Sequence, residues 1–482
     1  MIIKKNIDCG RKIIGIGAAN AFPFIIPSYF LKDYSIMCIR DRKDTRLIKK
    51  HVQVFCVEDL IPNVNVAKVN QQELLDQEVS QEYLSKFNNL FIFVRKTTPS
   101  TQHLTDEKHL KLLGNSKTVR DPFENKLIFR QTLKSIGIKT VDGFSIPYRE
   151  MNFDVIKKAQ SKLGKKLVLQ AAELTHGGGV GTGFIEDKND YDTYMDRMDR
   201  VINLNGRKIE NINIAKFVSG TPSSVLGCVT KFGVIVGSIQ TQIQDIPEVC
   251  NLSKGDGVYC GHDWYYKKTT KKIYDQVYKI TNEFGKKIAE SGYKGIFGLD
   301  LIIDYGTGQV YPIECNPRYT DALPVASFLA MEKRVPSLEY YHFLEHLELD
   351  YKLNVKRINE KYRKQFKASQ ILLMSKSDFL TKNNGELEAG IYEYKKENLK
   401  FIKQSFEIKD IRNNNQFLIT DGVSFKNTLF KPRSRIVRLV FKISILKKDK
   451  ELKDEIKKLI NLVYDKLDFK VVSDPNTLEY GK

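Results

Sequence analysis

The feature that most constrains this chain is a pair of apolar strands predicted between residues 295 and 316. In the first strand Asp300 lies between Leu299 and Leu301, so the two-residue period of a strand turns its carboxylate to the opposite face. Gly306-Thr307-Gly308 supplies a turn, after which the chain runs back as a second strand. The sequence therefore predicts a hairpin with a polar group in the middle of one face.

This hairpin gathers residue types that hold magnesium and phosphate. We expect Asp300 to lie close to Glu314 and Asn316 on the second strand, with Arg318 beyond them. Hard oxygen ligands of this kind suit Mg²⁺ that also holds substrate phosphates, and a neighbouring arginine suits charge stabilisation during phosphoryl transfer. Solvated acidic side chains are the alternative, but three oxygen ligands on apolar strands are poorly explained as surface residues. We predict a metal site at Asp300, Glu314 and Asn316, with Asn316 and Arg318 as catalytic residues.

The same residues resemble the metal-binding core of the ATP-grasp superfamily, in which an acidic residue on one strand precedes Glu-x-Asn on the next. Asn316-Pro317-Arg318 resembles the members akin to biotin carboxylase and to the carboxylate–amine ligases. The resemblance covers roughly residues 10–330 and is absent from the C-terminal third. It implies ATP and Mg²⁺ as cofactors, with Mn²⁺ as an alternative metal.

Length and composition set the class of protein. A chain of 482 residues is too long for one compact core and indicates two to four domains. Its 41% hydrophobic and 28% charged residues are typical of soluble globular proteins. There is no apolar run of membrane-spanning length, no recognisable signal peptide and no Cys-x-x-Cys pair, so we expect a cytoplasmic protein without structural zinc.

The net charge of +20 leaves two interpretations open. A strongly basic chain can bind nucleic acid or a membrane surface. However, the lysines are spread along the whole chain, which favours a general lysine-rich composition and a small anionic substrate. Nucleic acid is thus kept as an alternative partner that we do not favour.

The expected fold is a multidomain α/β and α+β protein. Strands separated by helical segments predict a parallel βαβ sheet near the N-terminus, where Gly15-x-Gly17 is interpreted as a tight turn rather than a nicotinamide site because the third glycine is missing. The resemblance implies a Rossmann-like pre-ATP-grasp domain at 1–115 and an ATP-grasp domain of two α+β subdomains at 116–335. Its lid subdomain would span about 140–215, and an extra mixed β domain would occupy 336–482.

Three segments are candidates for nucleotide binding. An amphipathic helix is predicted over residues 121–137, and Lys126 matches a family lysine that reaches nucleotide phosphate. The loop at 175–183 is too rich in glycine for a plain connection and can wrap phosphates with backbone N–H groups. The resemblance identifies this loop as the phosphate lid, and its candidate glycines are Gly177, Gly178, Gly179 and Gly181.

The strand before the lid departs from the family pattern. Gln170 stands where the family usually has a phosphate-binding lysine, so the charge expected there is absent. The segment at 212–220 resembles the hinge strand whose backbone contacts adenine. Its candidate residues are Lys216, Phe217 and Val218.

The acceptor side is predicted at residues 252–264, interpreted as a specificity loop with His262 and Asp263 as substrate contacts. Gln240, Gln242 and Gln244 share one face of a strand, and one or two are expected to line the same pocket. The C-terminal third is predicted to contain helices at 338–349, 355–366 and 448–467, with strands between 369 and 446. It is expected to shape the acceptor site or to mediate a homodimer.

These observations predict an ATP-dependent carboxylate–amine ligase that forms an amide or peptide bond through an acyl phosphate. The expected partners are a small carboxylate and an amine, such as an amino acid or a short peptide. A bicarbonate-activating carboxylase relative and a non-catalytic basic nucleotide- or RNA-binding protein are the alternatives.

Overall fold

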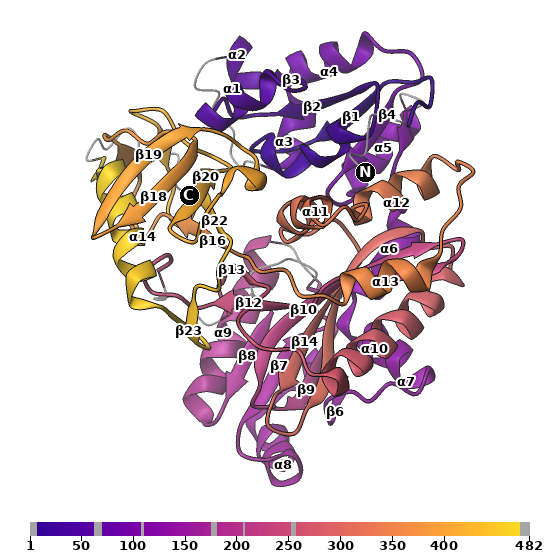
Figure 1. Ribbon diagram of the computed structural model, residues 1–482. Helices are drawn as coiled ribbons and strands as arrows, with labels where there is room; N and C mark the ends of the chain where they lie inside the picture. Colours follow the sequence, from indigo (N-terminus) through magenta and orange to yellow (C-terminus); the bar gives the residue numbers. More distant parts are fainter. Residues whose placement is uncertain are drawn as a thin grey trace.

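The computed structural model describes residues 7–61, 70–107, 110–174, 181–205, 208–251 and 257–472. Within them, the three larger sheets are an N-terminal sheet, drawn in indigo in Figure 1, a small sheet near α8 (Phe153–Leu163), and a long sheet that runs from the middle of the chain into its C-terminal part. The fold is thus multidomain and mixes parallel with antiparallel strands, as predicted. The domain boundaries themselves stay a prediction.

The N-terminal sheet has the order β3-β2-β1-β4-β5, with every pair parallel. This confirms the βαβ pattern read from the sequence. Its strands are β1 (Ile13–Ile16), β2 (Tyr34–Cys38), β3 (Gln53–Cys56), β4 (Phe91–Val94) and β5 (Lys111–Leu112). Its helices are α1 (Lys43–Lys49), α2 (Val57–Leu60), α3 (Gln71–Asp76), α4 (Glu78–Ser85) and α5 (Pro99–Glu107).

The segment between β1 and β2 differs from expectation. In place of one helix it holds two short 3₁₀ turns, η1 (Phe22–Phe24) and η2 (Ile26–Tyr29), each with a proline near its start. Pro27 has no N–H to donate to the preceding turn and cannot continue a helix. Gly15 packs against Tyr34, whose hydroxyl oxygen would lie 2.0 Å from an added Cβ, so this glycine serves close packing.

The small sheet has the order β6-β9-β7-β8 and falls within the predicted lid subdomain. Its strands are β6 (Gly143–Pro147), β7 (Leu167–Ala171), β8 (Thr182–Ile185) and β9 (Asn211–Lys216), and α8 and α9 (Lys188–Asn205) accompany them. The loop residues 175–180 lie outside the described residues.

The helix predicted over 121–137 is divided in two. Helix α6 (Lys117–Glu124) ends at Asn125, and α7 (Lys126–Ser135) begins directly after it. The Asn125 side chain accepts hydrogen bonds from the N–H groups of Leu127 and Ile128, which starts a new helix. This break places Lys126 at the first position of α7.

The long sheet has the order β15-β14-β10-β12-β13-β16-β22-β20-β18-β19, and β11 pairs with β10. Its strands from the middle of the chain are β10 (Thr221–Thr230), β11 (Gly233–Val236), β12 (Gln240–Gln244), β13 (Tyr259–Asp263), β14 (Gly295–Asp304) and β15 (Gln309–Asn316). Its C-terminal strands are β16 (Ser369–Met374), β18 (Gly390–Lys395), β19 (Asn398–Gln404), β20 (Gln416–Thr420) and β22 (Arg435–Phe441).

The C-terminal strands therefore continue the sheet that carries the predicted metal hairpin. Strand β13 pairs with β16, with His262 opposite Gln370. The sequence predicts a small mixed β domain that packs on the body, and the structure adds that its strands join the same sheet. Because ladder hydrogen bonds join the two parts, side chains from both lie along one face of one surface.

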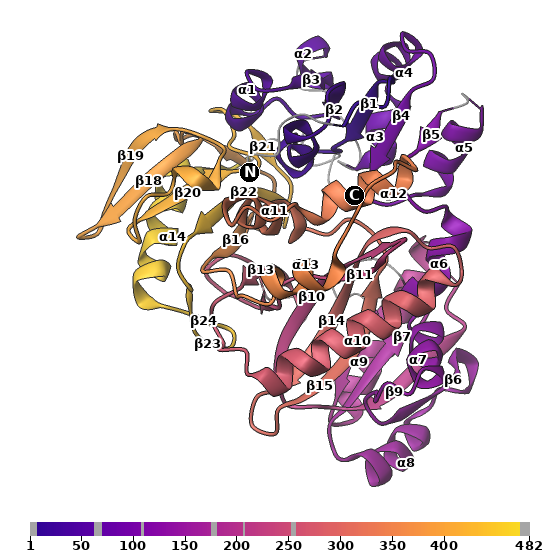
Figure 2. The ribbon, with the colours of Figure 1, turned by 45° about the vertical axis from the view of Figure 1, so that its right-hand side comes forward.

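The remaining elements lie around this sheet (Figure 2), and some of their strands form two small sheets of their own. Helix α10 (Lys271–Ala289) buries Phe284 against Phe297 of β14. The other helices are α11 (Leu323–Glu332), α12 (Leu338–His346), α13 (Val355–Tyr362) and α14 (Asp454–Leu467). The small strands are β17 (Thr381–Asn383), β21 (Leu429–Phe430), β23 (Leu446–Lys448), β24 (Glu451–Leu452) and β25 (Phe469–Val471). The helix predicted over 448–467 begins only at Asp454, because the preceding residues form the hairpin of β23 and β24.

A buried carboxyl group at the start of α12 gives a pH-dependent prediction. Burial raises the pKa of Glu339 to about 7, above the ordinary value of 4.5. Between these two values the folded protein binds more protons than the unfolded chain, so the free energy of unfolding falls as pH rises. Each pKa unit corresponds to about 1.36 kcal/mol. We therefore expect the free energy of unfolding of Glu339→Gln to fall by about 3 kcal/mol less over this pH range than that of the unmodified protein. Urea unfolding at about pH 5 and about pH 8 measures the difference; equal pH dependence in both proteins would contradict it.

Candidate functional site

The hairpin of β14 and β15 brings the predicted metal ligands together. Asp300 is paired directly with Glu314, and Gly298 with Asn316. The Asn316 Nδ2 group donates to Asp300 Oδ2 at 3.0 Å, and Gln242 Nε2 donates to Asp300 Oδ1 at 2.8 Å. The register shifts after Asp300, a bulge that re-aims the neighbouring side chains.

The electrostatics of the hairpin favour a cation. Burial, followed by the nearby charge of Glu314, raises the pKa of Asp300 to about 7. Two carboxylates held this close repel each other, and a bound divalent cation would relieve the repulsion. The described residues contain no cluster of three or more His, Cys, Asp or Glu side chains suited to a metal ion. The ligand set predicted here consists instead of two carboxylates and the Asn316 amide.

Arg318 is held on both sides. Its Nη2 donates to Asn316 Oδ1 at 2.7 Å, and its Nε donates to Glu124 Oε1 at 3.3 Å. Glu124 is buried and also pairs with Lys96, at 2.9 Å, and with Arg120. Burial alone would raise the pKa of Glu124, but Lys96 and Arg318 outweigh it and lower that pKa. The Glu124 carboxylate thus orients the Arg318 guanidinium beside the β14–β15 hairpin.

Lys126 faces the same hairpin from the start of α7. Its Nζ donates to the carbonyl of Leu174 at 3.0 Å and lies 3.7 Å from Glu314 Oε1. The lysine is almost completely buried. Its position at the first turn of α7 follows from the Asn125 cap.

These groups line one cavity of about 820 Å³. Both the predicted nucleotide residues and the predicted metal residues contribute to its wall. Of the predicted site residues, the lining includes Lys126, Gln170, Gly181, Lys216, Phe217, Val218, His262, Asp300, Glu314, Asn316 and Arg318. Gly177, Gly178 and Gly179 lie outside the described residues. Their roles in binding remain predictions.

Asp263 corrects the predicted acceptor site. Residues 259–263 form strand β13 rather than a loop, so His262 and Asp263 point to opposite faces. His262 lines the cavity, whereas Asp263 is buried away from it and accepts hydrogen bonds from Ser444 Oγ and the Ile445 N–H. Asp263 is therefore placed as a structural carboxylate.

His262 belongs to a hydrogen-bond network that includes side chains of the C-terminal strands β16 and β22. Its Nδ1 atom is 2.9 Å from Tyr259 Oη and 3.0 Å from Gln370 Nε2. Burial lowers the pKa of His262 to about 3, so the ring is neutral at physiological pH. With Nδ1 accepting, the ring proton is on Nε2. Arg438 donates in turn to Gln370 Oε1.

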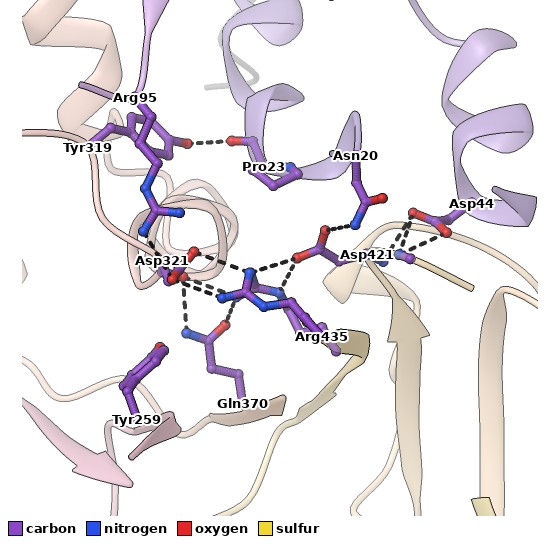
Figure 3. A network of polar contacts seen from close by, with 12 residues as sticks. Asn20, Pro23, Asp44, Arg95, Tyr259, Tyr319, Asp321, Gln370, Asp421 and Arg435 are labelled. Atoms are coloured by element: carbon purple, nitrogen blue, oxygen red, sulfur yellow. Dashed lines mark hydrogen bonds and ion pairs between the residues drawn. The ribbon is translucent and has the colours of Figure 1, made fainter. Parts of the chain in front are cut away.

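A second carboxylate joins three parts of the chain (Figure 3). Asp321, three residues after Arg318, pairs with Arg95 at 3.1 Å and with Arg435 at 3.0 Å. Arg95 follows β4 of the N-terminal sheet, and Arg435 begins β22. Burial alone would raise the pKa of Asp321, but Arg435 and Arg95 outweigh burial and hold that pKa well below its usual range.

Several cavity residues were not predicted. Arg130 lies one helical turn after Lys126, so an i,i+4 reading of α7 could have identified it. Gln240, Gln242 and Gln244 all line the cavity, which extends the prediction of one or two. Arg95 and Arg433 also line it. No local pattern marks these last two, because their neighbours in space come from distant parts of the chain.

The comparisons with known proteins agree with this geometry. Residues 124–322 match the family model of the ATP-grasp domain. The match supports the ATP-grasp resemblance for this part of the chain. The carbamoyl phosphate synthase large chain of Clostridium acetobutylicum is 22% identical over 254 residues. That match spans 52% of this chain and 22% of the relative, so the chain covers well under two thirds of the relative's length.

Several solved structures resemble nearly the whole chain in fold. The biotin carboxylase of Campylobacter jejuni has a TM-score of 0.61 at 13% identity, covering 97% of this chain and 96% of that one. The biotin carboxylase domain of Hydrogenobacter thermophilus 2-oxoglutarate carboxylase, solved with MgADP and bicarbonate, has a TM-score of 0.59 at 15% identity, covering 89% and 86%. Carboxyaminoimidazole ribonucleotide synthase of Aspergillus clavatus, solved with ATP, has a TM-score of 0.53 at 13% identity, covering 95% and 99%. At these identities the likeness establishes the fold.

No helix within the described ranges combines the length and the apolar character needed to cross a membrane.

Proposed function

We propose that this protein is an ATP-dependent ligase that joins a carboxylate to an amine through an acyl phosphate. The observation that carries the proposal is the convergence of Asp300, Glu314, Asn316, Arg318 and Lys126 on one cavity. Oxygen ligands, a fixed guanidinium and a buried ammonium are what phosphoryl transfer to a carboxylate requires. The nucleotide-bound states of the similar solved structures support ATP as the substrate.

The nucleotide would lie between the small sheet and the long sheet. Lys216 and Phe217 already donate their N–H groups to the carbonyls of Asp142 and Lys166. We therefore assign the hinge donor for adenine to the N–H of Val218. Lys126 and Arg130 supply positive charge toward the phosphates, which offsets the neutral Gln170 on β7.

Asp300, Glu314 and Asn316 would hold Mg²⁺, with Mn²⁺ as an alternative. The donor set fits, because it offers only hard oxygen atoms beside a phosphate site. Bound Mg²⁺ would neutralise phosphate charge. Gln242 and Asn316 orient the Asp300 carboxylate, and Glu124 orients Arg318 toward the developing charge.

The two chemical steps balance without another reactant. The substrate carboxylate oxygen bonds to the γ-phosphorus as the bond to ADP breaks. The amine nitrogen then bonds to the acyl carbon as phosphate leaves, and the amine proton passes to solvent. Arg318 stabilises the acyl phosphate and its tetrahedral successor, since positioned charges act most strongly where charge develops.

The test is ADP release with Mg²⁺ and ATP across pools of amino acids, short peptides and small carboxylates, with mass spectrometry of the products. Release that requires a carboxylate together with an amine, and yields a condensed product, is the expected result. Release driven by bicarbonate alone would support a carboxylase relative instead. An RNA gel shift without any ADP release would favour the non-catalytic alternative.

A further inference from the structure

The cavity continues well past the β14–β15 hairpin, which carries the proposed metal ligands. Asp300 lies on β14, whereas Met374 and Ser375, which also line the cavity, lie at the end of β16. Strands β10, β12 and β13 separate them in the sheet. Four strand spacings of about 4.8 Å correspond to about 19 Å across the sheet. This distance exceeds what bicarbonate or a single small amino acid would fill.

The intervening floor is polar. Gln242 Nε2 contacts Asp300, and Gln244 Nε2 donates to Gln242 Oε1 at 3.0 Å, which forms a row of amides leading away from the metal hairpin. Gln240 is buried, and its Oε1 atom has no hydrogen-bond partner within the described residues. A buried amide of this kind is costly unless a ligand satisfies it. The floor therefore suits a substrate that extends along it.

Two arginine side chains on this acceptor side have N–H groups that are not used in hydrogen bonds to the described residues. Arg433 lines the cavity, and in the part of the chain that the structure describes its side chain makes no hydrogen bond or ion pair. Arg95 bonds Asp321 through Nη2 alone, which leaves its other N–H groups available. Figure 3 shows Arg95 and Arg435 reaching Asp321 from different directions.

The nearby carboxylates already have partners. Asp321 is shared by Arg95 and Arg435. Asp245 pairs with Lys450 at 2.5 Å and accepts the N–H groups of Gly257 and Val258. Arginine fork groups beside an elongated cavity recognise carboxylate or phosphate oxygens.

We propose that the acceptor side binds an elongated substrate with a second anionic group, and that Arg433 and Arg95 bind that group. This inference rests on the proposed function for the identity of the reacting end, next to Arg318. The second anion is a carboxylate or a phosphate, and it lies at the end of the substrate away from the reaction. Arg433 and Arg95 are thus specificity residues supplied by the C-terminal and N-terminal parts of the chain.

The test uses binding, so that it does not require turnover. The intact protein with MgADP is titrated with linear dicarboxylates from glutarate to sebacate, with their monoamides, and with the matching ω-phosphono carboxylates. Binding is measured from the rise in thermal unfolding midpoint, because a ligand of the folded state stabilises it by mass action. We expect half-saturation of at least one dianion at a concentration about 10-fold or more below that of its monoamide, as for a hydrogen bond to a charged group. Whether dicarboxylate or phosphonate binds more tightly identifies the second anion.

Arg433→Gln and Arg95→Gln are expected to remove the preference for the dianion, whereas the control Arg412→Gln keeps it. Arg412 is an exposed arginine of the same C-terminal part, and it lies outside the cavity lining. Loss of the preference in either cavity variant supports the proposal. The proposal is overturned if dianion and monoamide reach half-saturation at equal concentrations in the unmodified protein, or if neither shifts the unfolding midpoint. It is also overturned if the preference for the dianion persists in both cavity variants. Discrimination without ADP release would keep this inference and reject the ligase proposal.

Discussion

A protein carrying Asp300→Asn together with Glu314→Gln is expected to lose ADP release in the presence of Mg²⁺, ATP and substrate. The two carboxylates face each other across β14 and β15 and supply both negative charges of the proposed metal site. Removing positioned charge at a phosphoryl-transfer site typically costs about 10²–10³-fold in rate for each group. The combined loss should therefore reach the detection limit of a coupled ADP assay.

The matched control is Asp304→Asn on the same strand. Asp304 is partly exposed and ends β14 at the hairpin turn, where it accepts hydrogen bonds from the N–H groups of Gly306 and Thr307. It lies outside the cavity lining, so ADP release should stay close to that of the unmodified protein. Circular dichroism and thermal unfolding establish that both variants fold. Full turnover by the folded double variant would rule out the proposed metal ligands.

Arg438→Ala is expected to give the largest loss of stability, about 3–5 kcal/mol in the free energy of unfolding, as for a buried ion pair that loses one partner. The Arg438 side chain is completely buried and pairs with Asp421 at 2.7 Å. It also donates to Gln370 and to the Asp321 carbonyl. Its removal leaves a buried carboxylate without its main counter-charge. Urea unfolding measures the loss.

Two further variants separate the ion pair from general effects. Arg412→Ala, at an exposed arginine, should change the free energy of unfolding by no more than about 0.5 kcal/mol. Adding Asp421→Asn to Arg438→Ala should recover part of the loss, because the uncompensated charge is gone. Asp421 has a positive φ of 60°, which asparagine tolerates. A small loss in Arg438→Ala alone would contradict the expected effect.

Asp421 also shows why the pair matters beyond the C-terminal strands. Its side chain accepts from Asn20 at 3.1 Å, and the N–H of the next residue, Gly422, donates to Asp44. Both of these partners belong to the N-terminal part (Figure 3). The Arg438 variant should therefore loosen the contact between the first and last parts of the chain.

The sequence alone determined the local pieces of this protein. Alternation around Asp300, the turn at 306–308 and the Glu-x-Asn spacing are local patterns, and they predicted the hairpin that the structure contains. The parallel N-terminal sheet followed from its strand and helix pattern in the same way. The ATP-grasp resemblance rests on these motifs, and the family match over 124–322 supports it for that part of the chain.

Local patterns predict the structure less well in two situations. One is where adjacent side chains point to opposite faces of a strand, and the other is where a side chain caps a new helix. His262 and Asp263 were grouped because they are adjacent, but a strand turns adjacent side chains to opposite faces. The apolar pattern predicts one continuous helix over 121–137, but the Asn125 side chain caps a second helix. In each case a hydrogen bond or a backbone direction outweighed the apolar pattern.

Only the tertiary structure decided which distant residues share the cavity. Arg95, Asp321 and Arg435 come from three parts of the chain, and nothing in their local sequence links them. The long sheet brings such distant residues together. The pairing of β13 with β16 places the C-terminal strands in the same sheet as the β14–β15 hairpin. Sequence periodicity reports which way a side chain points within one element, whereas the pairing of strands far apart in the chain depends on the packing of the whole molecule.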